Sequence, residues 1–149
     1  MGSHLKGYRK ETEALNSYIK LIRAAESVSS RINLSLSNHD LTESQFGVLE
    51  ALYHLGSLSQ TALAKKLLKS GGNMTTVIDN LEKSGLVKRK RGVKDRRYFS
   101  VHLTPKGKNK ISAVLPNHVK LIVDEFIILN AEEQKELQRL CKIVGLKKR

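Results

Sequence analysis

The feature that most constrains this fold is a change of apolar spacing near residue 85. From 60 to 68 and from 71 to 84, apolar residues recur every three or four positions, which predicts two short helices with a turn at Lys69-Ser70. From 86 to 91 and from 97 to 103 they form short runs instead, on either side of the turn sequence 92–95. The order predicts a helix-turn-helix followed directly by a β-hairpin.

Longer helices are predicted on both sides of this unit. The segment 11–37 has apolar residues at helical spacing and no glycine or proline, and it is too long for a small domain to cover. A further helix begins after Leu41, where Thr42 and Gln45 have the spacing of a capping box. Thr104 and Asn130 occupy the capping positions of the last two helices.

These patterns predict a mainly α fold with a small β-hairpin wing. The winged helix-turn-helix would occupy residues 41–104 and bind DNA, and the N- and C-terminal helices, 5–38 and 105–149, would pair two subunits. Residues 1–4, Met-Gly-Ser-His, read as the remnant of an expression tag and are left out of this interpretation.

Positive charge is concentrated on the predicted hairpin. The chain has 27 lysines and arginines against 14 acids, a net charge of +13, which favours a polyanionic partner. Seven of these cations lie between Lys88 and Arg97, with Asp95 as the one acid among them. A solvated charge run is the ordinary interpretation of such a stretch. Its place directly after a helix-turn-helix favours double-stranded DNA instead.

Two groups of residues are candidates for DNA contact. Short polar side chains on the second helix can reach base edges and phosphates, and the start of that helix can hold a phosphate. Arginines on the hairpin suit a narrow minor groove, because a guanidinium sheds its water more readily than an ammonium group. The candidates are Ser70, Asn73, Thr75, Thr76 and Asn80 on the helix, and Arg89, Arg91, Lys94, Arg96 and Arg97 on the hairpin.

Two of the charged residues have open roles. Arg89 lies beside residues expected to enter the core, so a structural role is the alternative to DNA contact. Asp79 fits poorly against a polyanion, and it would either bond locally or accept a hydrogen bond from a cytosine amino group.

The chain resembles the MarR (multiple antibiotic resistance regulator) family over nearly its whole length. The resemblance rests on motifs in order, including Leu41-Thr42-x-x-Gln45-Phe46, Leu58-Ser59-Gln60, Leu81-Glu82-Lys83-x-Gly85-Leu86-Val87-x-Arg89, Asp95-Arg96-Arg97 and Leu103-Thr104-x-x-Gly107. It implies a homodimeric regulator, usually a repressor, that binds pseudo-palindromic operators. The second helix would enter the major groove and the wing the minor groove, with Arg97 probing it and Asp95 steadying the wing.

The resemblance also implies that a signal releases the DNA. MarR relatives commonly bind small aromatic, phenolic or quinone-like molecules, or react with oxidants, where the dimerisation and DNA-binding parts meet. We expect such a pocket near Tyr18, Ile22, His39, Phe46 and His54. Cys141 is a weaker candidate, since it lies on an apolar stripe and the family's peroxide sensors carry their cysteine near the N-terminus.

Other functional classes find little support. A single cysteine excludes an internal disulfide, the histidines lack metal-ligand spacing, and no catalytic motif or cofactor-binding loop is present, so we expect no metal, no cofactor and no enzyme activity. No apolar run reaches the roughly 20 residues that span a bilayer, which predicts a soluble, cytoplasmic protein. The remaining alternative is a nonspecific, nucleoid-type nucleic-acid-binding protein. A membrane-surface role fits less well, because the basic cluster lies on a hairpin and not on an amphipathic helix.

Overall fold

The computed structural model describes residues 9–67 and 71–149. Within them the chain is mainly helical, with one small sheet, as the apolar spacing predicts. The elements in chain order are α1 (Arg9–Ser37), α2 (Glu43–Leu55), β1 (Leu58–Ser59), α3 (Gln60–Lys66), α4 (Gly71–Lys83), β2 (Val87–Arg91), β3 (Phe99–Leu103), α5 (Pro105–Phe126) and α6 (Ala131–Leu146).

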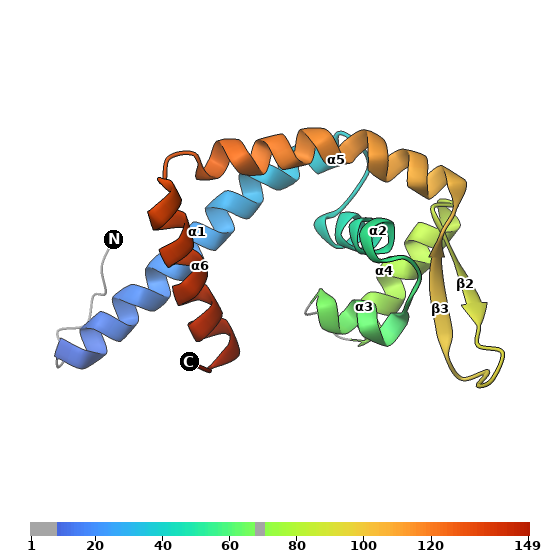
Figure 1. Cartoon of the computed structure of the whole chain (residues 1–149), viewed down its shortest axis with the longest axis horizontal. Helices are drawn as coiled ribbons and strands as arrows, with labels where there is room; N and C mark the ends of the chain where they lie inside the picture. The colour runs from blue at the N-terminus through green and yellow to red at the C-terminus, as the bar shows by residue number, and fades with distance from the viewer. Residues whose placement is uncertain (1–8, 68–70) are drawn as a thin grey trace.

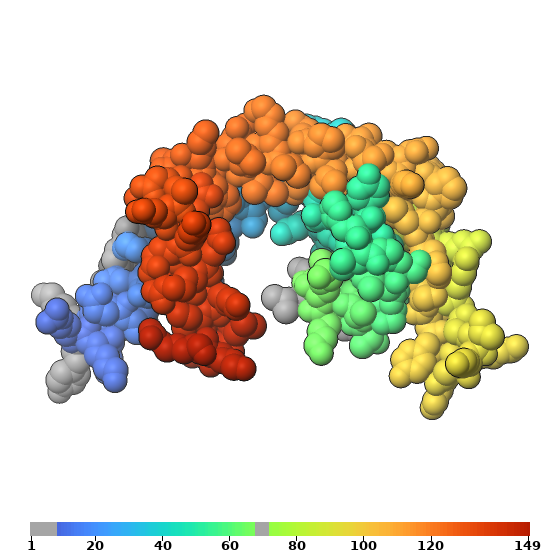
Figure 2. Space-filling view, in the orientation of Figure 1, coloured from blue at the N-terminus to red at the C-terminus, as the bar shows by residue number. Residues whose placement is uncertain are grey.

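The elements form an arch (Figures 1 and 2). Helices α1 and α5 contact each other along its top, where Arg31 donates two 2.7 Å hydrogen bonds to Glu125. A lobe formed by α2, α3, α4 and the sheet lies under one end, and α6 descends from the far end of α5 (Figure 1). The lobe and α6 therefore lie at opposite ends of the arch, and α5 spans the distance between them (Figure 1).

The buried core lies in the lobe. Its fully buried side chains come from α2, α3, α4, the sheet and the first half of α5, among them Leu49, Leu63, Ile78 and Ile111. Of the described residues in the terminal helices, α1 buries only Leu36 and α6 buries none. The lobe has its own hydrophobic core, whereas most of α1 and all of α6 lie outside it.

The predicted helix starts are confirmed. Thr42 Oγ1 accepts a hydrogen bond from Gln45 N at 3.1 Å, and Gln45 Oε1 accepts one from Thr42 N at 3.0 Å, which completes the capping box. Asn130 and Glu133 form the same reciprocal pair at the start of α6. These pairs satisfy backbone N–H groups that have no partner within the helix.

Replacing Thr42 by alanine is expected to lower the free energy of unfolding by about 1 kcal/mol, since it removes the acceptor for the Gln45 N–H. Thr42→Ser keeps the hydroxyl and should change stability by only a few tenths of a kcal/mol. Urea denaturation of both variants measures the difference. If Thr42→Ala and Thr42→Ser lowered the free energy of unfolding equally, the hydroxyl would not be what stabilises this helix start.

The sheet is larger than a hairpin. Strands β2 and β3 pair antiparallel, and β1, which was not predicted as a strand, pairs with the other edge of β3 through Leu58 opposite Val101. Both hairpin strands are shorter than predicted, so Arg97 lies in the turn and not on the return strand.

Helix α6 continues through Gly145 to Leu146, and it is Lys147 that takes the left-handed conformation, with φ 56°.

Candidate nucleic-acid interface

Helix α4 presents a polar stripe to solvent. Its apolar residues Met74, Val77, Ile78 and Leu81 are buried. The predicted contact residues Asn73, Thr75, Thr76 and Asn80 are all exposed, on the remaining surface of the helix. Ser70, the other candidate on this helix, lies outside the described residues. The helix is therefore fixed to the lobe by one face and offers short amide and hydroxyl groups on the other, the groups that bond to base edges and phosphates.

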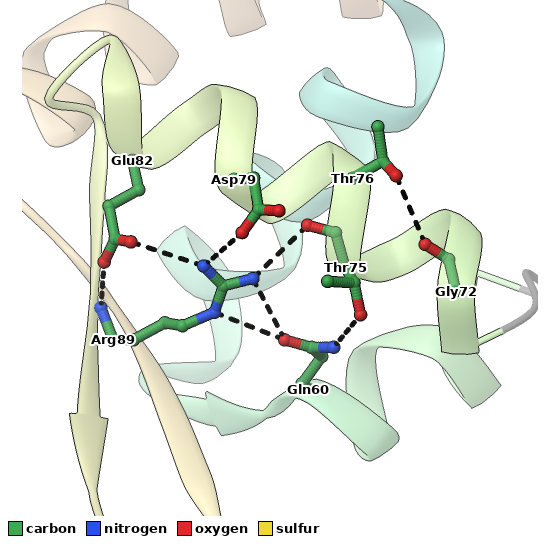
Figure 3. A network of polar contacts seen from close by, with 7 residues as sticks. All are labelled: Gln60, Gly72, Thr75, Thr76, Asp79, Glu82 and Arg89. Atoms are coloured by element: carbon green, nitrogen blue, oxygen red, sulfur yellow. Dashed lines mark hydrogen bonds and ion pairs between the residues drawn. The ribbon is translucent and has the colours of Figure 1, made fainter.

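Arg89 of β2, a candidate for DNA contact with a structural role as the alternative, is held within the protein by several hydrogen bonds. Its side chain is only 16% exposed and lies between β2, α3 and α4 (Figure 3). Nη1 donates to Asp79 Oδ1 at 2.6 Å and to Glu82 Oε1 at 3.3 Å, and Nε and Nη2 both donate to Gln60 Oε1. Bonded in this way, the guanidinium points into the protein and not towards a ligand.

The same contacts explain the acidic residue Asp79 on α4. Asp79 pairs with Arg89, which is the local bond considered from the sequence, and Glu82 also accepts a hydrogen bond from the Arg89 backbone N at 2.9 Å. A cation from the neighbouring strand thus compensates two carboxylates on α4. Without it, both would repel a phosphate backbone placed against this helix.

The tip of the wing is organised by Asp95. Its Oδ1 accepts hydrogen bonds from Arg97 N at 3.0 Å and from Arg97 Nε at 3.1 Å, and its Oδ2 accepts one from Arg97 Nη2 at 3.1 Å. These side-chain and backbone bonds from Arg97 lower the pKa of the Asp95 carboxyl. The Arg97 side chain is nevertheless 90% exposed, so it is held in place while remaining accessible.

The other cations of the hairpin remain at the surface. Arg91, Lys94 and Arg96 are exposed, and the Arg91 guanidinium lies 5.1 Å from the centroid of the Phe99 ring. The turn between the two strands requires a glycine at position 92, because a Cβ there would lie 2.6 Å from the Asp95 carbonyl oxygen. The wing therefore combines a compact turn with six exposed cations, which are Lys88, Lys90, Arg91, Lys94, Arg96 and Arg97.

Comparison with known proteins identifies the family. Residues 41–99, which run from the start of α2 to the start of β3, match the MarR family model. The HTH-type transcriptional regulator MhqR of Bacillus subtilis is 33% identical over 134 residues, which cover 90% of this chain and 92% of that protein. The chain belongs to the MarR family.

Solved structures of MarR-type proteins have the same fold. The MarR family regulator Sco3205 of Streptomyces coelicolor, crystallised in complex with DNA, is 24% identical with a TM-score of 0.85, over 96% of this chain and 91% of that one. BpsR of Bordetella bronchiseptica, whose DNA binding is regulated by 6-hydroxynicotinic acid, is 25% identical with a TM-score of 0.79, over 87% and 98%. This chain is a MarR-type transcriptional regulator, and its relatives are regulators rather than enzymes.

In this MarR protein a cavity of about 320 Å³ lies between α1, α2 and α5, where the lobe joins the long helices. Phe46 lines it, as expected, together with Ile32 and Ile122, and with Glu43 and Glu50 among its polar groups. His118 of α5 also lines it and was missed from the sequence. Its ring centroid lies 4.1 Å from that of Phe46, and burial lowers its pKa.

The other expected pocket residues are not gathered there. Tyr18, Ile22 and His39 do not line this cavity, and His54 borders a separate, more open one beside Leu55. Both Tyr18 and Ile22 lie on exposed stretches of α1, 63% and 38% exposed. The spacing Val114, His118, Ile122 was the signal that could have placed the histidine on the inner face of α5.

Three further features bear on function. Within residues 9–67 and 71–149, histidine, cysteine and acidic side chains nowhere gather in a group of three that could hold a metal ion. No helix in this part of the chain is long and apolar enough to cross a membrane. Cys141 is exposed, on the side of α6 that carries Leu137, Leu140 and Val144.

Proposed function

We propose that this regulator is a cytoplasmic repressor that binds a pseudo-palindromic operator as a homodimer. The observation that carries the proposal is that the polar stripe of α4 and an accessible, arginine-rich wing belong to the same lobe. The hydrogen bonds of Arg89 connect α4 to β2, the first strand of that wing. This pairing places base-reading groups and minor-groove cations side by side, and two such lobes would read two half-sites about 34 Å apart. The DNA complex of the similarly folded Sco3205 supports the same use of the fold.

The apolar surface of the terminal helices supports dimerisation. Large apolar side chains on α1, on the second half of α5 and on α6 are strongly exposed in the single chain, including Leu34 at 68%, Val123 at 55% and Val144 at 57%. Where exposed apolar side chains form a large patch, they mark an interaction surface in soluble proteins. A second copy of the chain is the partner we propose for it, because symmetric operators are read by symmetric dimers.

Release by a small molecule is the third part of the proposal. The cavity between α1, α2 and α5 is lined by Phe46 and His118 and lies between the lobe and the helices proposed to dimerise. A planar aromatic ligand there, phenolic or quinone-like, would separate these elements and change the distance between the two lobes. The regulation of BpsR by 6-hydroxynicotinic acid supports an aromatic ligand over an oxidant signal.

Binding to DNA from the chain's own promoter region, titrated against a random duplex of equal length, tests the proposal. We expect a preference of about a thousandfold or more for the operator. Equal affinity for the two duplexes would instead support the nonspecific nucleic-acid-binding alternative.

Arg97→Ala is expected to weaken binding to both duplexes and to reduce the salt dependence of binding by about one unit of slope, because one phosphate or groove contact is lost. The matched control is Lys120→Ala, which removes the same charge from an exposed position on α5. Fluorescence anisotropy over a series of salt concentrations gives both slopes. An unchanged slope for Arg97→Ala would remove the wing tip from the interface.

A further inference from the structure

The hydrogen bonds of Arg89 connect α4 with both β2 and α3 (Figure 3). Thr75, Asp79 and Glu82 are spaced by four and three residues, so they lie along one side of α4. Each offers an acceptor to Arg89, Thr75 through its backbone oxygen at 3.3 Å. Gln60 of α3 accepts from the same guanidinium and donates through Nε2 to Thr75 Oγ1 at 2.7 Å. A single side chain from β2 therefore connects two turns of α4 with the start of α3.

Such a network sets how the helix is rotated about its own axis. The buried residues Met74, Ile78 and Leu81 hold α4 against the core, but apolar packing is not directional. Hydrogen bonds to a planar group are directional, and these bonds lie between the core-facing side of α4 and the exposed stripe. They thereby fix the direction in which Asn73, Thr76 and Asn80 point.

We propose that Arg89 and Gln60 are positioning residues that determine sequence discrimination without touching the DNA. The proposal rests on the proposed function, since it assumes that α4 reads a sequence. Arg89 is mostly buried, and its Nε, Nη1 and Nη2 atoms all donate to protein acceptors. A small rotation of α4 would move its amides and hydroxyls out of register with base edges, while contacts to phosphates through long, flexible lysines and arginines would persist.

Arg89→Lys is the decisive variant, because it keeps the positive charge and removes the planar guanidinium with its several N–H donors. An ammonium group cannot reach Asp79, Gln60 and the Thr75 carbonyl together in the way that a planar guanidinium does. The bond from the residue 89 backbone N to Glu82 is retained, so the end of α4 stays tied to β2. The net charge of the protein, and with it the electrostatic attraction to DNA, is unchanged.

The experiment selects binding sites from a randomised duplex library with the wild-type protein, and then measures the affinity of each variant for the selected duplex and for a random one. We expect Arg89→Lys to bind the selected duplex about tenfold more weakly. Its affinity for the random duplex should stay within about twofold of wild type, with the same salt slope. Gln60→Ala, which leaves the Arg89–Asp79 ion pair in place, should shift discrimination in the same direction by a smaller factor.

Each alternative outcome is distinguishable. Equal losses on both duplexes, with the salt slope reduced by about one, would make Arg89 a phosphate contact and overturn the proposal. Unchanged discrimination in a folded Arg89→Lys protein would also overturn it. If the wild-type protein selects no consensus sequence, the proposed function fails and not the positioning role. Thermal unfolding of each variant, with binding measured well below its midpoint, separates discrimination from loss of fold.

Discussion

Replacing Gly107 by alanine is expected to lower the free energy of unfolding by about 3 kcal/mol, near the upper end of what overpacking usually costs. A Cβ at this position would lie 2.0 Å from the carbonyl oxygen of Leu86 and 3.0 Å from Leu103 Cδ1. That carbonyl also accepts the Thr104 backbone N–H at 3.1 Å, so it cannot move without loosening the start of α5. The roughly 1 kcal/mol that alanine normally contributes within a helix is too small to offset this.

Gly145→Ala is the matched control. Gly145 also lies within a helix, but an added Cβ there would meet nothing within 4 Å. This variant should be more stable than wild type by roughly 0.5–1 kcal/mol. Thermal or urea unfolding at one protein concentration measures both. If both substitutions changed the free energy of unfolding in the same direction, the result would contradict the close approach of α5 to Leu86.

The features that could be predicted from the sequence are those whose causes lie close together along the chain. Thr42 and Gln45 are three residues apart, and so are Asn130 and Glu133, so the chemistry of each capping box is visible in the sequence. The Asp95–Arg97 contact at the wing tip is equally short in range. The three-to-four-residue spacing of apolar residues predicted the helices, and the change of that spacing near residue 85 predicted the position of the wing.

What could not be predicted depends on contacts between distant residues. The choice between a DNA-contact role and a structural role for Arg89 was decided by Gln60, which is 29 residues away, and by the side of α4 that the strand meets. The pairing of β1 with β3 joins Leu58 to Val101. His118 meets Phe46 only because α5 crosses α2, which neither helix pattern alone can show. Position in sequence identified the candidates, and tertiary packing decided their roles.

A double substitution on α6, Leu140→Glu with Val144→Glu, is expected to convert the protein to a monomer and to weaken operator binding at least a hundredfold. The two side chains are 46% and 57% exposed in the single chain and lie one turn apart on the same side of α6. Burying two carboxylates in an apolar interface costs several kcal/mol each unless they find partners. A monomer reads one half-site at a time, so it loses the gain in affinity that comes from binding two linked sites at once.

The control is Leu55→Glu, which places one such carboxylate at an apolar residue of α2 that is 55% exposed and belongs to the lobe. Light scattering should give one chain mass, 16.7 kDa, for the double variant and twice that mass for the control and the wild type. The double variant should still bind random duplex with the wing and α4 of a single lobe, because α6 lies at the opposite end of the arch from both (Figure 1). A double variant that stays dimeric would place the subunit interface elsewhere, on α1 or the exposed half of α5. A monomer that keeps full operator affinity would show that one lobe is sufficient for recognition, and the two-half-site proposal would fail.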